Sequence, residues 1–405
     1  MKMRLDWLVI TVWCSLLILA SCKEPVTSSV TVPVVLDHNR MLVDAEIQRT
    51  DGSWCKARLW VDTGNPSFYL SETLARDLGI ILSDSRENAD IPPPTGVRID
   101  GMQLNFDGVR SRIMFEPHWL FSAMHNDGNL PSSVLKKYHV VLDYPERRFT
   151  IAEPGTVHPR GTRVPASFHS ETGIPQIDAV VDGDSLSFAL DNGASYSFVS
   201  YDVFESLLER HPDYPHATGA TGCANMWGWW PPQEQTLPVM RLPEVWGGPV
   251  RLTEVGIVGV PEVAENGPSL GAWYSQKTAR PVVGFLGPNA FKGFRVEIDY
   301  ANSAIYFEKG VQHDPHDMDL VGLTLRPEKD GSFTIIGVAM KDGIPVVEGI
   351  EPGDVLLRVD DLETTGATLG TVVDALRGKP GDVRVLEVDR NGKRIVVETK
   401  VARVL

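Results

Sequence analysis

Two stretches of the sequence match one another without a gap: RLWVDTGNPSFYLS at residues 58–71 and SFALDNGASYSFVS at residues 187–200. In each stretch, an apolar strand-like run leads into an Asp and a Gly, and a second apolar run ends at a Ser. Such a Ser is a preferred N-cap of a helix. The match indicates an internal repeat of strand, Gly-containing turn, strand and helix start.

A second pair of matching stretches follows: 138–151 comes after the first copy, and 294–307 comes after the second. The interval from Asp62 to Asp143 is 81 residues, and the equivalent interval from Asp191 to Asp299 is 108 residues. The sequence therefore predicts two homologous lobes, at residues 30–157 and 158–312, with the extra residues in the second lobe.

The composition fits a soluble globular chain of 405 residues that can hold two or three domains. Short β-branched and aromatic runs recur between clusters of Gly, Pro, Asn and Asp, which favours a mainly β fold. Helical patterns are short, at about 71–78, 201–209 and 368–376. The net charge of −15, with no long basic run, argues against nucleic acid as a partner and against a polybasic membrane patch.

The N-terminus has the layout of a secretory signal. Two basic residues precede an apolar run at 7–20, which at 14 residues is shorter than the ~20 that a membrane helix needs. The run ends at Cys22, and its last residues resemble the lipobox of bacterial lipoproteins, in which the Cys is acylated. We expect a signal peptide at 1–21, a polar tether at 22–29 and a lipid-anchored protein of the cell envelope, facing the periplasm or the exterior; an uncleaved anchor is the alternative.

Asp62 and Asp191 occupy equivalent positions in the two motifs. A carboxylate between two apolar strands is costly to bury without compensation. If the lobes face each other, the two carboxyls can share one proton, because like charges ~3 Å apart do not both ionise. One carboxyl then acts as a base and the other as an acid toward a water nucleophile. The alternative is that Asp-Xaa-Gly is only a turn signal.

These motifs resemble those of the retropepsin-like and pepsin-like aspartic proteases in their bacterial two-lobed form. The resemblance covers residues 30–310 and rests on 59–64, on 189–195 and on the apolar-apolar-Gly element at 284–287. It implies two β-barrel lobes, a peptide or protein substrate, and neither a cofactor nor a metal. It also implies that Asp62 and Asp191 are catalytic, and it assigns support of the active-site loops to Thr63, Gly64, Asn192 and Gly193.

The sequence departs from the family pattern at two places. Asn192 stands where the family has Thr or Ser, so reciprocal hydroxyl bracing of the two loops is expected to be lost, although an amide can still donate a hydrogen bond. Residues 129–131 replace the apolar-apolar-Gly element of the first lobe, and Pro131 lacks a backbone donor. The best candidate for a flap hairpin is at 218–222.

The last residues, 316–405, resemble a bacterial PDZ domain and are expected to fold and bind peptide C-termini on their own. The resemblance rests on 319–325, which matches the carboxylate-binding loop and its strand, and on the turn at 349–356. It implies a peptide-binding groove in which free amides hold a terminal carboxylate. The residues assigned to this groove are Leu320, Val321, Gly322, Leu323, Val372 and Leu376; core packing is the alternative for the two helix residues.

Several other features carry less weight. Cys55 and Cys223 are expected to be unpaired thiols, although an oxidising compartment permits a disulfide. The acidic and histidine residues at 313–319 are expected to form a solvated connector rather than a metal site. The tryptophans at 227–230 could line a groove or pack under a loop. Two functions therefore compete: an envelope-anchored aspartic endopeptidase, and an inactive peptide-binding scaffold that uses the PDZ groove.

Overall fold

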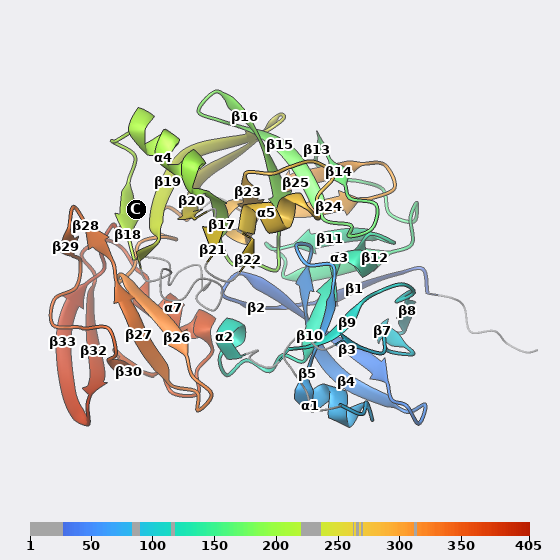
Figure 1. The fold of residues 1–405 in the computed structure, drawn as a ribbon, viewed down its shortest axis with the longest axis horizontal. Helices are drawn as coiled ribbons and strands as arrows, with labels where there is room; N and C mark the ends of the chain where they lie inside the picture. Colours follow the sequence, from blue (N-terminus) through green and yellow to red (C-terminus); the bar gives the residue numbers. More distant parts are fainter. Residues whose placement is uncertain are drawn as a thin grey trace, which may run out of the picture.

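The computed structural model describes residues 27–82, 90–114, 118–219, 236–261, 263–264, 267–268, 270–311 and 314–405. The signal peptide, Cys22, Cys223, the tryptophans at 227–230, His313 and the predicted flap beyond Gly219 lie outside the described residues. The protein is mainly β, as predicted. Figure 1 shows a first lobe, a second lobe and a C-terminal unit (residues 316–405) beside them. Within the described part of the chain, no helix is both long and apolar enough to span a membrane.

The first lobe alternates short strands with three short helices. Its elements are β1 (Ser29–Pro33), β2 (Val35–Asp37), β3 (Arg40–Gln48), β4 (Trp54–Asp62), β5 (Phe68–Ser71), α1 (Glu72–Asp77), β6 (Asp90–Ile91), β7 (Val97–Ile99), β8 (Met102–Leu104), β9 (Ser111–Met114), α2 (His118–Phe121), β10 (Gly128–Pro131), α3 (Ser132–Leu135), β11 (His139–Asp143) and β12 (Arg148–Ala152). The predicted N-cap is confirmed at Ser71, whose hydroxyl accepts from the amide of Leu74 at 3.1 Å.

The second lobe has longer strands and a longer helix after the second motif. Its elements are β13 (Thr162–Pro165), β14 (Ser167–Phe168), β15 (Pro175–Val181), β16 (Asp184–Leu190), β17 (Ser197–Ser200), α4 (Tyr201–Arg210), β18 (His216–Thr218), β19 (Pro238–Gly247), β20 (Val250–Val260), β21 (Val263–Ala264), β22 (Gly267–Pro268), α5 (Leu270–Ser275), β23 (Gly284–Leu286), α6 (Pro288–Phe291), β24 (Phe294–Asp299) and β25 (Ala304–Lys309). Ser200 stands at the N-cap of α4 but makes no side-chain capping bond.

The two lobes share one strand arrangement. In the first lobe, β4 and β10 pair in parallel, and so do β5 and β9. In the second lobe, β16 and β23 pair in parallel, and so do β17 and β20. By the same correspondence, α2 of the first lobe stands where α5 stands in the second, between equivalent strands. The internal repeat seen in the sequence is therefore also a repeat of topology.

A sheet shared by the lobes joins them. Its strand order is β1-β12-β11-β24-β25-β13, and the antiparallel pair β11 and β24 crosses from one lobe to the other. In this sheet the His139 Nε2 atom and the Glu297 Oε1 atom lie 2.5 Å apart, and both side chains are buried. This arrangement fixes how the two lobes face each other, because a strand pair cannot slip by one residue without turning its core side chains outward.

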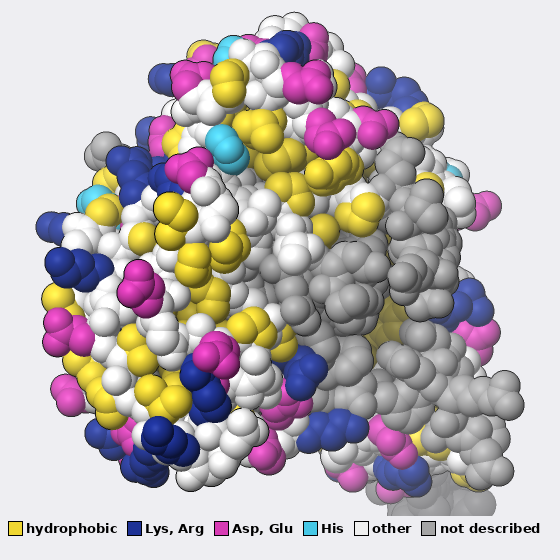
Figure 2. All heavy atoms as spheres, turned by 60° about the vertical axis from the view of Figure 1, so that its left-hand side comes forward, with side chains coloured by type: hydrophobic (Ala, Val, Ile, Leu, Met, Phe, Trp, Pro, Cys, Tyr) yellow, Lys and Arg dark blue, Asp and Glu magenta, His cyan; other side chains and the backbone are white. Residues whose placement is uncertain are grey.

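The C-terminal unit contains a six-stranded sheet, one helix and two short strands that join the sheet of the second lobe. Its elements are β26 (Leu323–Pro327), β27 (Phe333–Val338), β28 (Met340–Lys341), β29 (Ile344–Pro345), β30 (Val355–Val359), β31 (Leu362–Glu363), α7 (Leu369–Leu376), β32 (Val383–Arg390) and β33 (Lys393–Lys400). The main strand order is β26-β27-β30-β32-β33, with its own apolar core under α7. Figure 2 shows apolar and charged side chains interspersed on the face turned forward from the left of Figure 1.

The C-terminal unit packs against both lobes, and the expectation that it also folds on its own stays a prediction. Strand β28 pairs with β18 of the second lobe at Thr218 and Met340. On the other side, Asp37 of the first lobe accepts a hydrogen bond at 2.9 Å from the amide of Gly370, near the start of α7. Backbone pairing of this kind ties the unit to both lobes, because the groups involved would otherwise lose buried hydrogen bonds.

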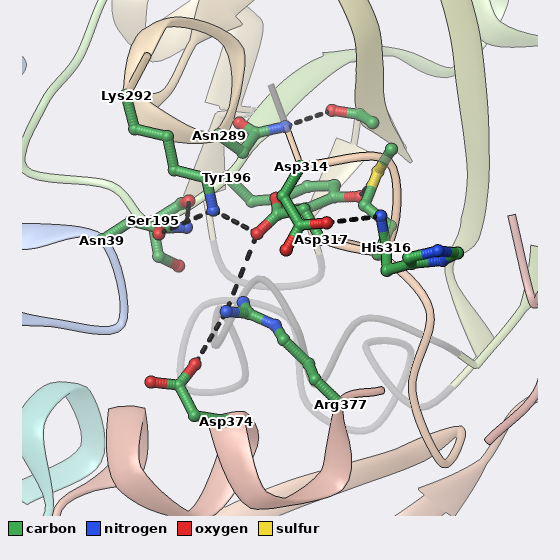
Figure 3. A network of polar contacts seen from close by, with 12 residues as sticks. Asn39, Ser195, Tyr196, Asn289, Lys292, Asp314, His316, Asp317, Asp374 and Arg377 are labelled. Atoms are coloured by element: carbon green, nitrogen blue, oxygen red, sulfur yellow. Dashed lines mark hydrogen bonds and ion pairs between the residues drawn. The ribbon is translucent and has the colours of Figure 1, made fainter. Parts of the chain in front are cut away.

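The connector at 314–319 is exposed at Asp314 and Pro315 and buried from Asp317 on, so the expectation of a solvated segment is corrected for its second half only. Asp317 and Asp319 are buried. Figure 3 shows Asp317 between Lys292 of the second lobe and Arg377 of the C-terminal unit, and Lys292 also reaches the Asn39 side chain of the first lobe at 3.3 Å. The connector is therefore an ion-paired junction of all three parts of the protein.

Candidate active site

Asp62 ends β4, and its carboxyl is held by a side-chain amide and by the backbone amides of Gly64 and Asn65. The amide of Gly64 donates to Asp62 Oδ1 at 3.1 Å. The side-chain amide of Asn129, on the parallel neighbour β10, donates to Asp62 Oδ2 at 3.2 Å. The Oδ1 atom of Asn129 accepts from the Tyr69 amide at 2.7 Å, which fixes the orientation of the side chain. Asp62 is only 5% exposed.

Asp191 follows β16, and its carboxyl accepts from two backbone amides and a tyrosine hydroxyl. Its backbone amide donates to the Leu286 carbonyl of β23 at 3.0 Å, which holds the turn against the sheet. Its Oδ1 atom accepts from the amides of Gly193 and Ala194 at 2.8 and 3.1 Å. Its Oδ2 atom accepts from the hydroxyl of Tyr274 on α5. Asp191 is 4% exposed.

The two Asp-containing turns lie against each other across the lobe interface. A Cβ atom added to Gly64 would lie 2.1 Å from Asp191 Cγ, and one added to Gly193 would lie 2.3 Å from Asp62 Oδ1. Each carboxyl therefore lies against the backbone of the other lobe's motif, and only Gly leaves the room. This reciprocal contact brings the two carboxyls into one buried site, as the repeat predicted.

Thr63 and Asn192 brace the two turns. The Thr63 hydroxyl donates to the Leu190 carbonyl at 2.8 Å and accepts from the Asn192 amide at 3.0 Å. In return, Asn192 Oδ1 accepts from the Thr63 amide at 2.8 Å. The sequence predicted that Asn192 loses the reciprocal bracing, and this is wrong for the bond from the Thr63 amide, because the side-chain oxygen of Asn192 accepts it as a hydroxyl would. The Asn192 side chain therefore braces the turns as an acceptor, whereas it was expected to act as a donor.

Arg40, at the start of β3, adds a buried positive charge beside the two carboxyls. Its side chain is 1% exposed, and Nε donates to the Gly193 carbonyl at 2.8 Å. Burial lowers the pKa of Arg40 to about 10, while the charges of Asp37, Asp191 and Asp62 act in the opposite direction. Arg40 therefore remains charged at neutral pH and offsets part of the negative charge of the site.

The carboxyls are electrostatically unequal. Burial raises the pKa of Asp62, and the charge of Asp191 raises it further, whereas the bonds from Asn129 and from the amides of Gly64 and Asn65 oppose the shift. Burial also raises the pKa of Asp191, and it is opposed by the Tyr274 hydroxyl, two backbone amides and the charge of Arg40. Donors to a carboxylate favour its charged form. Each carboxyl has three such donors, so the difference between them is the charge of Arg40, which favours the negative charge on Asp191 and leaves the proton on Asp62.

The sequence found the carboxyls and turns of this site but missed three of its side chains: Arg40, Asn129 and Tyr274. Asn129 had been noted only as a departure from a family pattern, and its position one strand from Asp62 was the available signal. Arg40 and Tyr274 lie far from the motifs in the sequence, and no local pattern distinguishes them from other polar residues in strands and turns.

The groove residues predicted in the C-terminal unit are buried. Their exposed fractions are 5% for Leu320, 0% for Val321, 2% for Leu323, 0% for Val372 and 1% for Leu376, and Gly322 is buried as well. The Val321 amide donates to the Leu376 carbonyl at 2.9 Å, so it is not the free donor that was expected. In this conformation these residues belong to the core and the loop is closed against the end of α7.

The nearby first lobe lies over the same part of the C-terminal unit. Ser122, just after α2, forms a strand-like bridge with Thr368 at the start of α7, and its hydroxyl donates to the Ala367 carbonyl at 3.2 Å.

Among the cysteines, Cys55 is a free thiol, while Cys223 lies outside the described residues.

Comparisons with known proteins find matches among the solved structures. Neither the protein-family models nor the curated proteins contain a match to this chain. Among solved structures, the chain is similar to the aspartic proteinase from Irpex lacteus, with a TM-score of 0.40 and 11% identity, covering 70% of this chain and 98% of that chain. The similarity is too low to carry a statement about activity, so the functional assignment rests on the residues of the site.

Proposed function

We propose that the protein is an aspartic endopeptidase in which Asp62 and Asp191 hydrolyse peptide bonds through a water nucleophile. The observation that carries the proposal is the reciprocal contact of the two turns, which puts each carboxyl against the other motif's Gly. A buried pair of carboxyls with raised pKa values is the arrangement that lets one proton be shared. A role in the turns alone would require neither the burial nor the contact.

The charge of Arg40, which favours ionisation of Asp191, suggests the roles of the two carboxyls. Ionised Asp191 accepts a proton from a water molecule as the water oxygen attacks the carbonyl carbon of the peptide. Asp62 donates its proton to the carbonyl oxygen, and a tetrahedral diol results. The peptide nitrogen then receives a proton from Asp191, the carbon–nitrogen bond breaks, and a diol proton returns to Asp62. Thr63 and Asn192 keep the two turns in register throughout, and the amides at Gly64 and Gly193 hold the carboxyls.

The remaining parts suggest where the enzyme works. We place it at the cell envelope, anchored by a lipid on Cys22, on the strength of the apolar run and tether described above. The sequence of residues 316–405 supports a PDZ-type unit that recognises peptide C-termini. Because the Val321 amide is already bonded and the groove residues are buried, such binding requires this unit to open from the conformation described here.

A non-catalytic scaffold is the second candidate. The observation that favours it is the near-complete burial of both carboxyls, together with the Tyr274 hydroxyl already bound to Asp191. In that case the lobes would serve as a platform, and the shared geometry of the two turns would be structural. The two candidates differ in one measurable respect, because only the peptidase needs both carboxyls for turnover.

The decisive experiment compares the full-length protein with Asp62→Asn and Asp191→Asn in cleavage of a diverse peptide library between about pH 3 and 7. We expect pepstatin-sensitive cleavage that falls by orders of magnitude in either variant, with the double variant little worse than the single ones. Asp361→Asn, at an exposed position in the C-terminal unit, is the matched control and should cleave normally. Cleavage that survives Asp191→Asn would overturn the peptidase assignment in favour of the scaffold.

A further inference from the structure

Tyr274 makes a contact that the proposed reaction does not use. It lies on α5, is 1% exposed, and its hydroxyl donates to Asp191 Oδ2. Its ring packs against Phe285 with centroids 5.2 Å apart and against Trp273 at 5.0 Å. These ring contacts direct the polar end of the side chain at the carboxyl that the proposed mechanism assigns as the base.

The position of α5 in the fold gives this contact a counterpart. Its equivalent in the first lobe, α2, ends at Phe121, which is 0% exposed. The Phe121 ring lies 5.4 Å from that of Trp60 and 5.6 Å from the Arg40 guanidinium. Since Arg40 bonds to the turn of Asp191, each lobe uses the same topological position to bring an aromatic ring to the site.

Tyr274 donates to an oxygen atom, Asp191 Oδ2, that the proposed base needs for its reaction with water. A nucleophilic water must hydrogen-bond to the base that takes its proton. Two of the acceptor positions on Asp191 are filled by backbone amides at Oδ1, and the Tyr274 hydroxyl binds the other oxygen, Oδ2. Water, or a hydroxyl group of a transition-state analogue, therefore competes with Tyr274 for this oxygen.

We propose that Tyr274 is an internal cap of the candidate active site, which an extended peptide must displace before hydrolysis. This inference rests on the proposed peptidase function. The cap is released by rotation of the Tyr274 side chain. The backbone at this residue stays in place, because its carbonyl accepts from the Thr278 hydroxyl at 2.9 Å and from the Lys277 amide at 2.7 Å. Thr278 itself is only 4% exposed.

The test compares wild type with Tyr274→Phe, which keeps the ring and removes the hydroxyl. A hydrogen bond to a charged group is worth enough to change an equilibrium roughly 10- to 100-fold. We expect pepstatin, whose hydroxyl serves as the probe, to bind Tyr274→Phe more tightly by up to that factor in titration calorimetry, and peptide cleavage to rise. Tyr300→Phe is the control, because it removes a buried hydroxyl that has no partner and lies away from the site; it should change neither quantity.

The outcomes separate the cap from the peptidase assignment. Loss of a donor to the charged form raises the pKa of Asp191, so the acid limb of any pH–rate profile should also move to higher pH in Tyr274→Phe. Tighter pepstatin binding without cleavage in either protein would support the cap and refute the peptidase. Cleavage by wild type that falls in Tyr274→Phe, with pepstatin affinity unchanged or weaker, would show that Tyr274 positions Asp191 and would overturn the cap.

Discussion

Replacement of Thr63 by Val tests the brace between the lobes. Val has the shape of Thr, so the substitution removes only the hydroxyl, which lies in a fully buried position. It leaves the Leu190 carbonyl and the Asn192 amide without the partners they had at 2.8 and 3.0 Å. A buried polar group without a partner costs about 1–3 kcal/mol, so the two together should lower the free energy of unfolding by about 2–6 kcal/mol.

Thr63→Ser is the matched variant, because it keeps the hydroxyl and loses one buried methyl group, at a cost of about 1 kcal/mol. Urea unfolding of the full chain, followed by circular dichroism, gives the comparison. Hydrogen exchange of the segment that contains Asn192 gives a local readout, since its amide should lose protection in Thr63→Val and keep it in Thr63→Ser. If the two variants unfold at the same urea concentration and exchange alike, the hydroxyl does not brace the lobes and the reasoning fails.

Three further predictions follow from the site and the N-terminus. Because the pKa of Asp62 is raised above its ordinary 3.8, the folded protein keeps a proton that the unfolded chain releases, so stability should fall as the pH rises from about 4 toward 7. The melting temperature of Asp62→Asn should fall less over this range than that of wild type. An equal fall in both proteins would count against the shared charge. Asn129→Leu removes a donor to Asp62 and should move the alkaline limb of the pH–rate profile to higher pH; an unmoved limb would show that Asn129 does not act on the carboxyl. Cys22→Ala should release the protein from membranes on fractionation, and protein that stays bound would rule out the lipid anchor.

The placement of the C-terminal unit changes what an experiment on it can show. Its β28 strand pairs with the second lobe, and the Gly370 amide of α7 donates to Asp37 of the first lobe. Cutting the chain near residue 316 would expose both contacts, as well as the buried ion pairs of Asp317 and Asp319. Peptide binding by this unit is therefore best measured in the full chain, where competition with the first lobe is present.

The sequence by itself determined the mainly β class, the repeat, the two Asp-containing turns and the three helices at 71–78, 201–209 and 368–376. Each of these follows from a local pattern: side-chain alternation in strands, Gly at a turn, and a polar residue before a helix. The close approach of the turns at Gly64 and Gly193 could also be anticipated from the sequence, because two copies of one motif in two similar lobes are expected to face each other.

Only the tertiary structure decided which distant side chains complete the site. Arg40, Asn129 and Tyr274 reach the carboxyls from β3, β10 and α5, and their meeting depends on strand register and lobe packing rather than on any neighbouring residue. Whether Asn192 donates or accepts was likewise undetermined, since an amide offers both groups and the facing backbone amide of Thr63 selects the oxygen. The packing of the C-terminal unit was undetermined as well, because short strands such as β28 acquire their partner only when the lobes bring an open edge beside them.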